Sequence, residues 1–297
     1  MKGRFGGLIT AMVTPFDADG RVELGAAQKL AAWLLDNGSE GLVVTGTTGE
    51  GPTLTDQEKV DLWRAVAEAV GDRASVIAGS GTNDTAHSVH LTQAAEKAGC
   101  DAALVVTPYY NRPPQAGLLA HFRAVAAATE LPILMYDIPV RTGRKIEHPT
   151  LVELAQTPNI GGVKDAAGNV QAAARLVGEA TGAPGGFEVY CGNDADTLPW
   201  LAVGAVGVVS VASHVAGRRM ARMMELFWSG GVDDAQAINA SLLPVYDAMN
   251  VTANPIPVKA AMELVGHPAG SPRLPLPPAT PAEVATIRAA LSAAGLG

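Results

Sequence analysis

Eight short, predominantly apolar runs recur along the chain, and longer amphipathic stretches separate them. Such runs are typical of strands buried on both faces of a parallel sheet, because a strand with one face in water alternates between apolar and polar residues. Parallel strands need crossover connections, which the amphipathic stretches supply as helices. The expected strands are Leu8–Val13, Gly41–Val44, Val76–Ala78, Ala102–Val106, Ile133–Tyr136, Ile160–Val163, Phe187–Tyr190 and Val206–Val211.

Eight strands that alternate with helices favour a closed barrel over an open doubly wound sheet. An open sheet that binds a dinucleotide carries Gly-x-Gly-x-x-Gly after its first strand, and that motif is absent from the sequence. The length of 297 residues also fits, since such barrels occupy about 250 residues as one unit. Helices expected between the strands include Ala26–Asn37, Asp56–Val70, Thr85–Ala98 and Gln115–Thr129.

The strand pattern stops near residue 230. The remaining chain reads as three helices, Asp234–Met249, Val258–Val265 and Pro281–Ala294, with a Pro-rich segment before the last. We therefore expect an α/β protein in which residues 1–230 form a catalytic (β/α)₈ barrel. Residues 231–297 are expected to form a C-terminal helical extension packed on that barrel.

Charge and composition narrow the function. The net charge is −8 and no basic run occurs, which argues against a nucleic-acid partner. No window is long and apolar enough to cross a bilayer, so no membrane contact is expected. The two cysteines, Cys100 and Cys191, offer neither a disulfide framework nor a zinc pattern. A cytoplasmic protein without a metal site fits these features.

Barrel active sites lie at the carboxyl ends of the strands, so the polar residues that follow each apolar run are the candidates. Of seven lysines, only Lys164 directly follows a buried strand. Burial disfavours the ammonium form and favours the neutral amine, which can attack a carbonyl carbon. The alternative is a structural lysine paired with Asp165 or Glu50. Position alone leaves both interpretations open.

Three further groups could serve such an amine. Tyr136 ends the preceding strand, where its hydroxyl could move protons during imine formation, although a core tyrosine fits equally well. The turn Gly46–Glu50 offers consecutive backbone N–H groups that suit a carboxylate, but Gly-Thr-rich turns are common. Arg141 could pair with a second carboxylate. Asp165 and Asp194 are interpreted as caps of the helices that follow them.

Taken together, these segments resemble the dihydrodipicolinate synthase family over essentially the whole chain. Order and spacing agree as well as content, which makes the joint pattern specific. The matching segments are Thr10–Phe16, Gly46–Glu50, Thr107–Asn111, Tyr136–Pro139, Arg141–Gly143, Gly162–Asp165 and Gly192–Asp194.

The resemblance implies a lyase of lysine and diaminopimelate biosynthesis that condenses pyruvate with L-aspartate-4-semialdehyde and needs no cofactor. It also implies a homotetramer built from two tight dimers, in which the tyrosine at position 110 acts across a subunit interface. The implied catalytic residues are Lys164 as the Schiff-base lysine, with Tyr136, Thr47 and Tyr110 as a proton relay. The implied substrate contacts are Thr48 for the pyruvate carboxylate, Arg141 for the semialdehyde carboxylate, and Val209 and Gly192 beside the lysine.

The sequence departs from the family pattern in two places. Gly51-Pro52 follows Glu50, where many members carry Ser. Asp56, Lys59 and His87 stand where lysine-inhibited members carry His, His and Glu, whereas Asn83 and Tyr109 match that pocket. The added cation should repel a lysine ammonium group, so weak or absent feedback inhibition is expected.

Two alternatives remain at this stage. A sister aldolase acting on N-acetylneuraminate or a 2-keto-3-deoxy sugar acid would share Lys164 and Tyr136, although Arg141 and the pair Thr47-Thr48 favour the synthase. A non-catalytic barrel that binds a keto acid is the other alternative.

Overall fold

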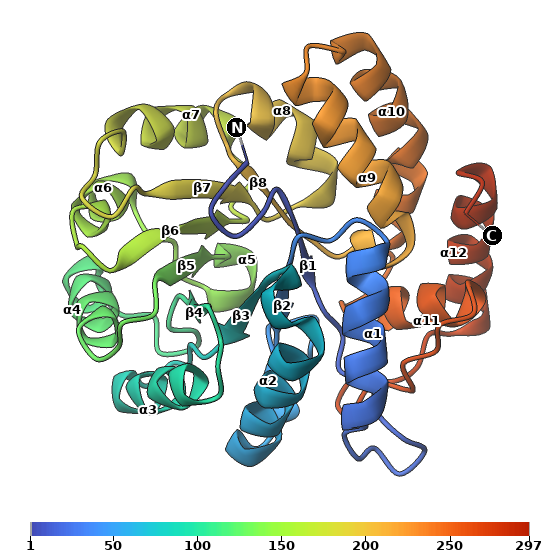
Figure 1. The fold of residues 1–297 in the computed structure, drawn as a ribbon, viewed down its shortest axis with the longest axis horizontal. Coiled ribbons are helices and arrows are strands. Elements are labelled where there is room, and N and C mark those ends of the chain that lie inside the picture. Colours follow the sequence, from blue (N-terminus) through green and yellow to red (C-terminus); the bar gives the residue numbers. More distant parts are fainter. Residues whose placement is uncertain (1, 297) are drawn as a thin grey trace.

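The computed structural model describes residues 2–296, so Met1 and Gly297, the outermost residues of the two expected regions, lie outside the described part. Within it, eight parallel strands close into a barrel in sequence order (Figure 1). The predicted (β/α)₈ barrel is thereby confirmed. The strands are β1 (Leu8–Ala11), β2 (Gly41–Val44), β3 (Ser75–Gly79), β4 (Ala102–Val106), β5 (Ile133–Asp137), β6 (Ile160–Asp165), β7 (Glu188–Cys191) and β8 (Gly207–Ser210).

Helices surround the barrel and return the chain to the start of each next strand (Figure 1). A capping box begins α2: the Glu58 N–H donates to the Thr55 hydroxyl, and the Thr55 N–H donates to the Glu58 carboxylate. The helix after β4 ends at Ala126, three residues earlier than expected. The helices of the barrel are α1 (Leu24–Asp36), α2 (Asp56–Val70), α3 (Thr85–Lys97), α4 (Gln115–Ala126), α5 (Pro139–Thr142), α6 (His148–Ala155), α7 (Val170–Glu179), α8 (Thr197–Ala202) and α9 (Ser213–Trp228).

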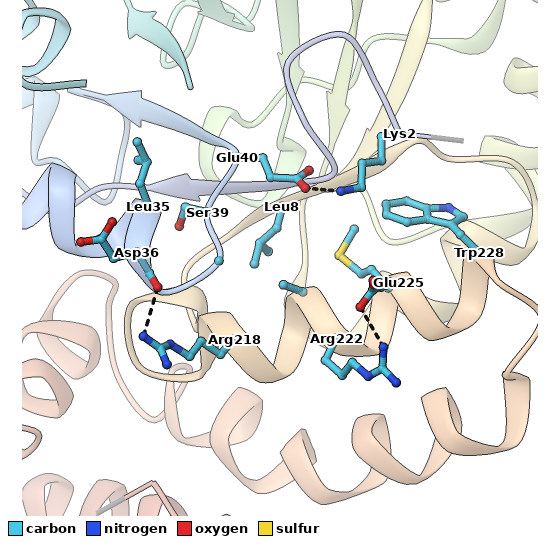
Figure 2. A pocket seen from close by; sticks show the side chains of 13 residues that line it. Lys2, Leu8, Leu35, Asp36, Ser39, Glu40, Arg218, Arg222, Glu225 and Trp228 are labelled. Carbon is cyan, nitrogen blue, oxygen red and sulfur yellow. Dashed lines mark hydrogen bonds and ion pairs between the residues drawn. The ribbon is translucent and has the colours of Figure 1, made fainter. Parts of the chain in front are cut away.

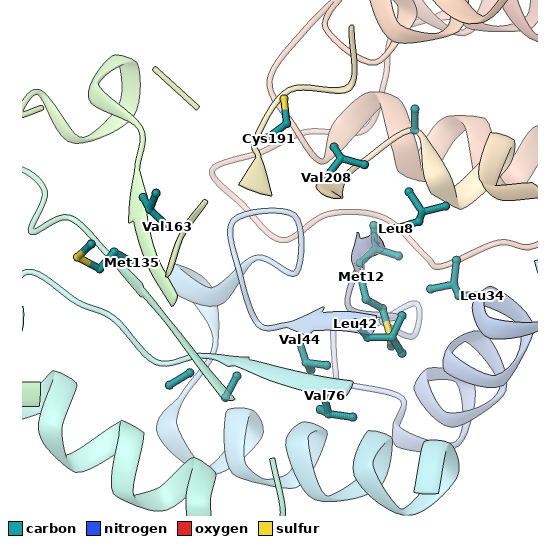
Figure 3. Close-up of a cluster of buried hydrophobic side chains, with 14 of the residues drawn as sticks. Leu8, Met12, Leu34, Leu42, Val44, Val76, Met135, Val163, Cys191 and Val208 are labelled. Atoms are coloured by element: carbon teal, nitrogen blue, oxygen red, sulfur yellow. The ribbon is translucent and has the colours of Figure 1, made fainter. Parts of the chain in front are cut away.

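The strands bury both faces, which explains why their sequences do not alternate in polarity. Every second side chain points into the barrel, where a small inner cluster includes Ile9, Ile77, Leu134 and Val209. The intervening side chains point outward and pack against the helices in a larger outer cluster. Figure 3 shows part of this outer cluster, with labels on Leu8, Met12, Leu34, Leu42, Val44, Val76, Met135, Val163, Cys191 and Val208.

One irregularity between β5 and β6 decides which side chains of β6 face inward. Ile133 pairs with Ile160, but the next residue, Leu134, pairs with Gly162, so Gly161 is an extra residue in β6. The Ile160 side chain points outward and packs in the outer cluster. Lys164 lies four residues later, so in a regular strand its side chain would also point outward. The bulge at Gly161 therefore turns Lys164 into the barrel.

β5 and β6 are each longer than the sequence indicated. The ladder between them continues through Tyr136 with Lys164 and Asp137 with Asp165. Lys164 was expected to follow its strand and instead lies inside it. The strand persists because residues of β5 and β7 pair with this part of β6 on both sides.

The C-terminal helices are α10 (Val232–Ala248), α11 (Ile256–Leu264) and α12 (Pro281–Ala293). They lie together on one side of the barrel, close to α9 and α1 (Figure 1). Arg219 of α9 helps to hold them, since its guanidinium donates to the Ser241 hydroxyl at 2.6 Å and to the Ala294 carbonyl. Among residues 2–296, no helix combines the length and apolar character that a membrane crossing requires.

The interpretation of Asp165 and Asp194 as caps of the following helices is wrong. The Asp165 carboxylate accepts the backbone N–H of Ala167 at 2.7 Å, and α7 is capped by Asn169 instead. The Asp194 carboxylate accepts the N–H groups of Val211 and Ala212, which follow β8. Asp194 thus joins the loops after β7 and β8, a tertiary contact that local sequence does not reveal.

Candidate active site

Lys164 and Tyr136 meet at the carboxyl ends of β5 and β6. They are register partners, so both side chains lie on the same face of the sheet, inside the barrel. The Lys164 Nζ lies 4.1 Å from the centroid of the Tyr136 ring. Lys164 is 6% exposed and Tyr136 5% exposed. The two groups that sequence reasoning paired are therefore in contact and shielded from water.

The structural-lysine alternative finds no support. Asp165 is the next residue along β6 and so points to the opposite face of the sheet. The Glu50 carboxylate forms its ion pair with the Lys259 ammonium at 2.8 Å, not with Lys164. In the described part of the chain, no carboxylate lies within ion-pair distance of the Lys164 amine. Lys164 is thus buried without a salt bridge, as a nucleophilic amine requires.

A pocket of about 570 Å³ opens beside this pair. Four of the predicted site residues line it: Thr47, Tyr110, Tyr136 and Arg141. The other four are not among its lining residues: Lys164, Thr48 and Val209 are buried, and Gly192 is half-buried. The remaining lining residues are Thr45, Gly46, Gly51, Pro52, Lys59, Gly79, Gly81, Thr82, Leu104, Val106, Tyr109, Arg112, Ile138, Val140, Thr142 and Gly143.

The turn after β2, residues 45–50, has the form expected of a carboxylate cradle. The backbone N–H groups of Thr47 and Thr48 donate to no acceptor within residues 2–296. Thr45 and Glu50, at its two ends, adopt left-handed φ angles of 62° and 56°, which non-glycine residues rarely do. Such a backbone persists only where the surroundings fix it.

Neighbouring elements supply that fixation. The Trp63 indole of α2 donates to the Thr45 hydroxyl at 2.8 Å. The Thr14 hydroxyl, after β1, donates to the Gly49 carbonyl at 2.6 Å. Both contacts are buried, so they are not weakened by competing water.

Val209 and Gly192 shape the space around the lysine. Val209 is 1% exposed and belongs to the same inner cluster as Tyr136. The Gly192 N–H donates to the Asp165 carbonyl at 2.8 Å, and a Cβ on Gly192 would lie 2.6 Å from the Ala166 Cβ. Only glycine permits this approach of the loop after β7 to the end of β6.

Tyr110 and Arg141 lie at the mouth of the pocket. Tyr110 is 90% exposed, with a left-handed φ of 71°, and Val140 nearby in the lining is 86% exposed. Arg141 lies in the short helix α5, which places it just past Tyr136 and Asp137. Its guanidinium forms no ion pair with any residue between positions 2 and 296, so it is available to an anion.

The pocket reaches one of the residues that depart from the family pattern. Lys59 lines it, and burial lowers the pKa of this lysine. The His87 ring lies 2.9 Å from the Asp56 carboxylate, and the Lys59 ammonium lies 3.9 Å from the same carboxyl group. Lys59 thus brings a basic group to the pocket, and the nearby Asp56 carboxylate is shared by two basic side chains.

Burial raises the pKa of two aspartates near the lysine. Asp194 is half-buried, and its burial raises its pKa, whereas hydrogen bonds from Ser210, Ala212 and Val211 and the Lys164 charge act in the opposite direction. Burial likewise raises the pKa of Asp137 to about 7, opposed by the backbone N–H of Ile146. Asp137 therefore changes charge near neutral pH.

Two other features carry no site. In the part of the chain that the structure describes, no group of three or more His, Cys, Asp or Glu side chains could hold a metal ion. A second hollow of about 470 Å³ lies at the amino-terminal ends of β1 and β2, between α1 and α9 (Figure 2). Its charges are satisfied internally, through Lys2 with Glu40 and Arg222 with Glu225.

Comparison with known proteins agrees with this geometry. A family model described as the dihydrodipicolinate synthetase family matches residues 4–294. The chain belongs to that family. A 4-hydroxy-tetrahydrodipicolinate synthase from Moorella thermoacetica is 51% identical over 293 residues, covering 99% of both chains. A synthase of the same name from Acidothermus cellulolyticus is 52% identical over 98% of this chain and 93% of its own length.

Solved structures of this family share the fold. The dihydrodipicolinate synthase of Cyanidioschyzon merolae, solved with lysine bound, superimposes with a TM-score of 0.95 at 46% identity. That match covers 99% of each chain. The resemblance inferred from separate motifs thus extends to the whole architecture.

Sequence reasoning missed three residues that contact the site from the C-terminal region: Asn254, Lys259 and Arg273. The Asn254 amide donates to the Thr48 hydroxyl at 2.9 Å, and Lys259 pairs with Glu50. These residues lie in a segment that reads only as helix and turn, so no local pattern marks them.

Asp137 should make folding stability depend on pH. The folded state binds its proton more tightly than the unfolded state, where the carboxyl has the ordinary pKa of 3.8, so the stabilisation is complete below that value and is lost as the pH rises through about 7. Between about pH 8 and about pH 5, the free energy of unfolding of the natural protein should rise by about 2–3 kcal/mol relative to Asp137→Asn. Denaturant unfolding at each pH measures this.

Asp101→Asn is the matched control. The Asp101 carboxylate also accepts one backbone N–H, from Val76 at 2.8 Å, but Asp101 is exposed. A difference between the natural protein and Asp137→Asn that stays constant with pH would show that Asp137 does not titrate in this range.

Proposed function

We propose that this chain is a 4-hydroxy-tetrahydrodipicolinate synthase, a lyase that binds pyruvate on Lys164 and condenses it with L-aspartate-4-semialdehyde in lysine and diaminopimelate biosynthesis. The observation that carries the proposal is the buried Lys164 amine, free of any salt bridge within residues 2–296, in contact with Tyr136, which lines the pocket. Family membership and full-length relatives of that name at about 50% identity support the activity.

The first step forms the Schiff base. The neutral Lys164 amine attacks the keto carbon of pyruvate, and the carbonyl oxygen leaves as water after two proton transfers. Tyr136 contacts the lysine and so is placed to carry these protons. Thr47 lines the same pocket and Tyr110 lies at its mouth, which fits their proposed role as the rest of the relay.

The carboxylate of pyruvate fits the turn after β2. Free N–H groups of Thr47 and Thr48 and the Thr48 hydroxyl would replace water around the anion. Val209 and Gly192 would bound the small apolar end of the substrate. Loss of a proton from the methyl carbon of the iminium then gives an enamine.

The enamine carbon attacks the aldehyde carbon of the second substrate and forms the new carbon–carbon bond. The carboxylate of the second substrate would pair with the Arg141 guanidinium, which is exposed at the mouth and unpaired within the described chain. The amino group of the second substrate then displaces Lys164 from the imine carbon and regenerates the free amine. No step in this scheme requires a cofactor.

A sister aldolase for a sugar acid is the second candidate. Lys164 and Tyr136 would serve it equally, so they do not discriminate. Arg141 at the mouth favours a short carboxylated aldehyde over a neutral polyhydroxy chain. A non-catalytic keto-acid-binding barrel has no use for a buried lysine against a tyrosine. We also propose that the enzyme works in the cytoplasm, and that residues 1–230 form the catalytic barrel while residues 231–297 support it.

Trapping with borohydride tests the mechanism. Reduction in the presence of pyruvate should fix the adduct on Lys164 alone, as peptide mass mapping would show. Lys164→Ala should fold normally and lose nearly all turnover, because it removes the amine that contacts Tyr136. Lys97→Ala is the matched control: it makes the same substitution at an exposed lysine of α3 and should leave labelling at Lys164 intact.

Labelling at any lysine other than 164, or half of the activity remaining in Lys164→Ala, would overturn the mechanism. Turnover with aspartate semialdehyde against N-acetylmannosamine separates the synthase from the sister aldolase. Preference for the sugar would select the second candidate.

We propose that the enzyme is a homotetramer of two tight dimers. Tyr110 and Val140 expose large apolar side chains at the pocket mouth, which suits burial by a second subunit. Sedimentation velocity should show a tetramer, and Tyr110→Ala should lower turnover without altering pyruvate labelling sites. A monomer with full activity would contradict this arrangement.

We propose weak or absent feedback inhibition by L-lysine. A lysine-bound relative shows that a family member holds this ligand, but here Lys59 adds a cation to the pocket and Asp56 is shared with His87. Lysine should therefore not inhibit at submillimolar concentration in a steady-state assay, and Lys59→Met should increase sensitivity. Strong inhibition of the natural protein at that concentration would refute this.

A further inference from the structure

The C-terminal segment 254–273 reaches back to the carboxylate turn. Asn254, Lys259 and Arg273 each contact a residue of the turn, although they lie more than two hundred positions later in the chain. Two of these contacts are made to Glu50, at the end of the turn, and one to Thr48, within it. The turn is thus held from a part of the chain outside the first 230 residues.

In the hydrogen bond between Asn254 and Thr48, Asn254 is the donor. The amide N–H of Asn254 donates, and the Thr48 oxygen accepts, at 2.9 Å. Thr48 is 3% exposed, and its hydroxyl hydrogen has no acceptor among residues 2–296. A buried hydroxyl normally uses its hydrogen, so this unused donor indicates an acceptor that arrives with a ligand.

Lys259 fixes the other end of the turn. The side chains of Lys259 and Glu50 are 3% and 1% exposed, and the Lys259 ammonium also lies 4.3 Å from the centroid of the Phe16 ring. The Arg273 N–H donates to the second oxygen of Glu50 at 2.8 Å. Both carboxylate oxygens of Glu50 are therefore engaged, which holds this residue in its left-handed conformation.

We propose that Asn254 is a positioning residue that presets Thr48 as a hydrogen-bond donor toward the carboxylate of the keto acid. The amide occupies the acceptor side of the hydroxyl, so the hydroxyl hydrogen points to the anion. The Lys259–Glu50 pair keeps the turn in place while this happens. The inference rests on the proposed role of Thr48 as a pyruvate contact, and it extends the site to the C-terminal region.

Asn254→Asp tests the direction of the bond with little change in shape. A carboxylate can only accept, so the Thr48 hydroxyl would donate to residue 254 and present a lone pair to pyruvate. Borohydride trapping on Lys164 at graded pyruvate concentrations, without the second substrate, measures the effect. The concentration for half-maximal trapping should rise about tenfold or more, because a hydrogen bond to a charged group is lost. Trapping at saturating pyruvate should remain complete.

Two further variants provide reference values for the half-maximal pyruvate concentration. Asn254→Ala removes the donor without reversing the bond and should raise the half-maximal concentration less than Asn254→Asp does. Asn250→Asp is the matched control, since the Asn250 amide also donates one bond, to the Tyr246 carbonyl at 2.8 Å, outside the site. It should bind pyruvate as the natural protein does.

Thr48→Val separates failure of this inference from failure of the proposed function. If Thr48→Val weakens pyruvate binding but Asn254→Asp does not, only the inference is overturned. If Thr48→Val leaves binding unchanged, the assigned role of Thr48 fails and the inference fails with it. In a Thr48→Val background the effect of Asn254→Asp should shrink; an undiminished effect would mean simple charge repulsion and would overturn the inference.

Equal weakening by Asn254→Ala and Asn254→Asp would show that the amide only supports packing, which also overturns it. Should Asn254→Asp fail to fold, Asn254→Ala and Thr48→Val decide together. Their effects on pyruvate binding must then be non-additive, because both act through one hydroxyl. Additive effects would count against the inference.

Discussion

The position of one amine depends on a single extra residue. Side chains along a strand alternate between the two faces of the sheet, so a slip of one residue exchanges every inward group for an outward one. Gly161 introduces that slip between β5 and β6. Without it, Lys164 would lie among the helices and Asp165 would face the barrel interior. The contact with Tyr136 and the proposed chemistry both depend on this local irregularity.

The order of the elements and the closed barrel could be predicted from the sequence, because strands buried on both faces leave a continuous apolar signature and their connections leave an amphipathic one. Tyr136 and Lys164 could also be placed side by side, since consecutive parallel strands are neighbours. The bulge could not be predicted, because Gly161-Gly162 has no apolar side chain that reveals which face it occupies. The role of Asp194 was misjudged for a related reason: its partners, Val211 and Ala212, are close only after the barrel closes.

Burial raises the pKa of the carboxyl groups of Asp137 and Asp194, near Lys164. Asp194 keeps its place because backbone N–H groups of the next loop donate to it. Asp137 has one such donor, the N–H of Ile146, and its other oxygen has no partner in the described chain. Its pKa is therefore raised to about 7. The number of N–H groups that reach each carboxylate therefore opposes the rise in its pKa that burial causes.

A turn at the end of a strand is free to move unless something beyond the strand holds it. The turn after β2 has a strained non-glycine residue at each end, and α2 and the loop after β1 hold only part of it. Glu50 obtains its partners from Lys259 and Arg273, and Thr48 from Asn254. A buried ion pair contributes little net stability, because desolvation offsets the attraction, but it strongly penalises any arrangement that separates the two charges. The C-terminal helices therefore do more than cover one side of the barrel: they restrict the turn to one conformation, which the barrel strands alone do not define.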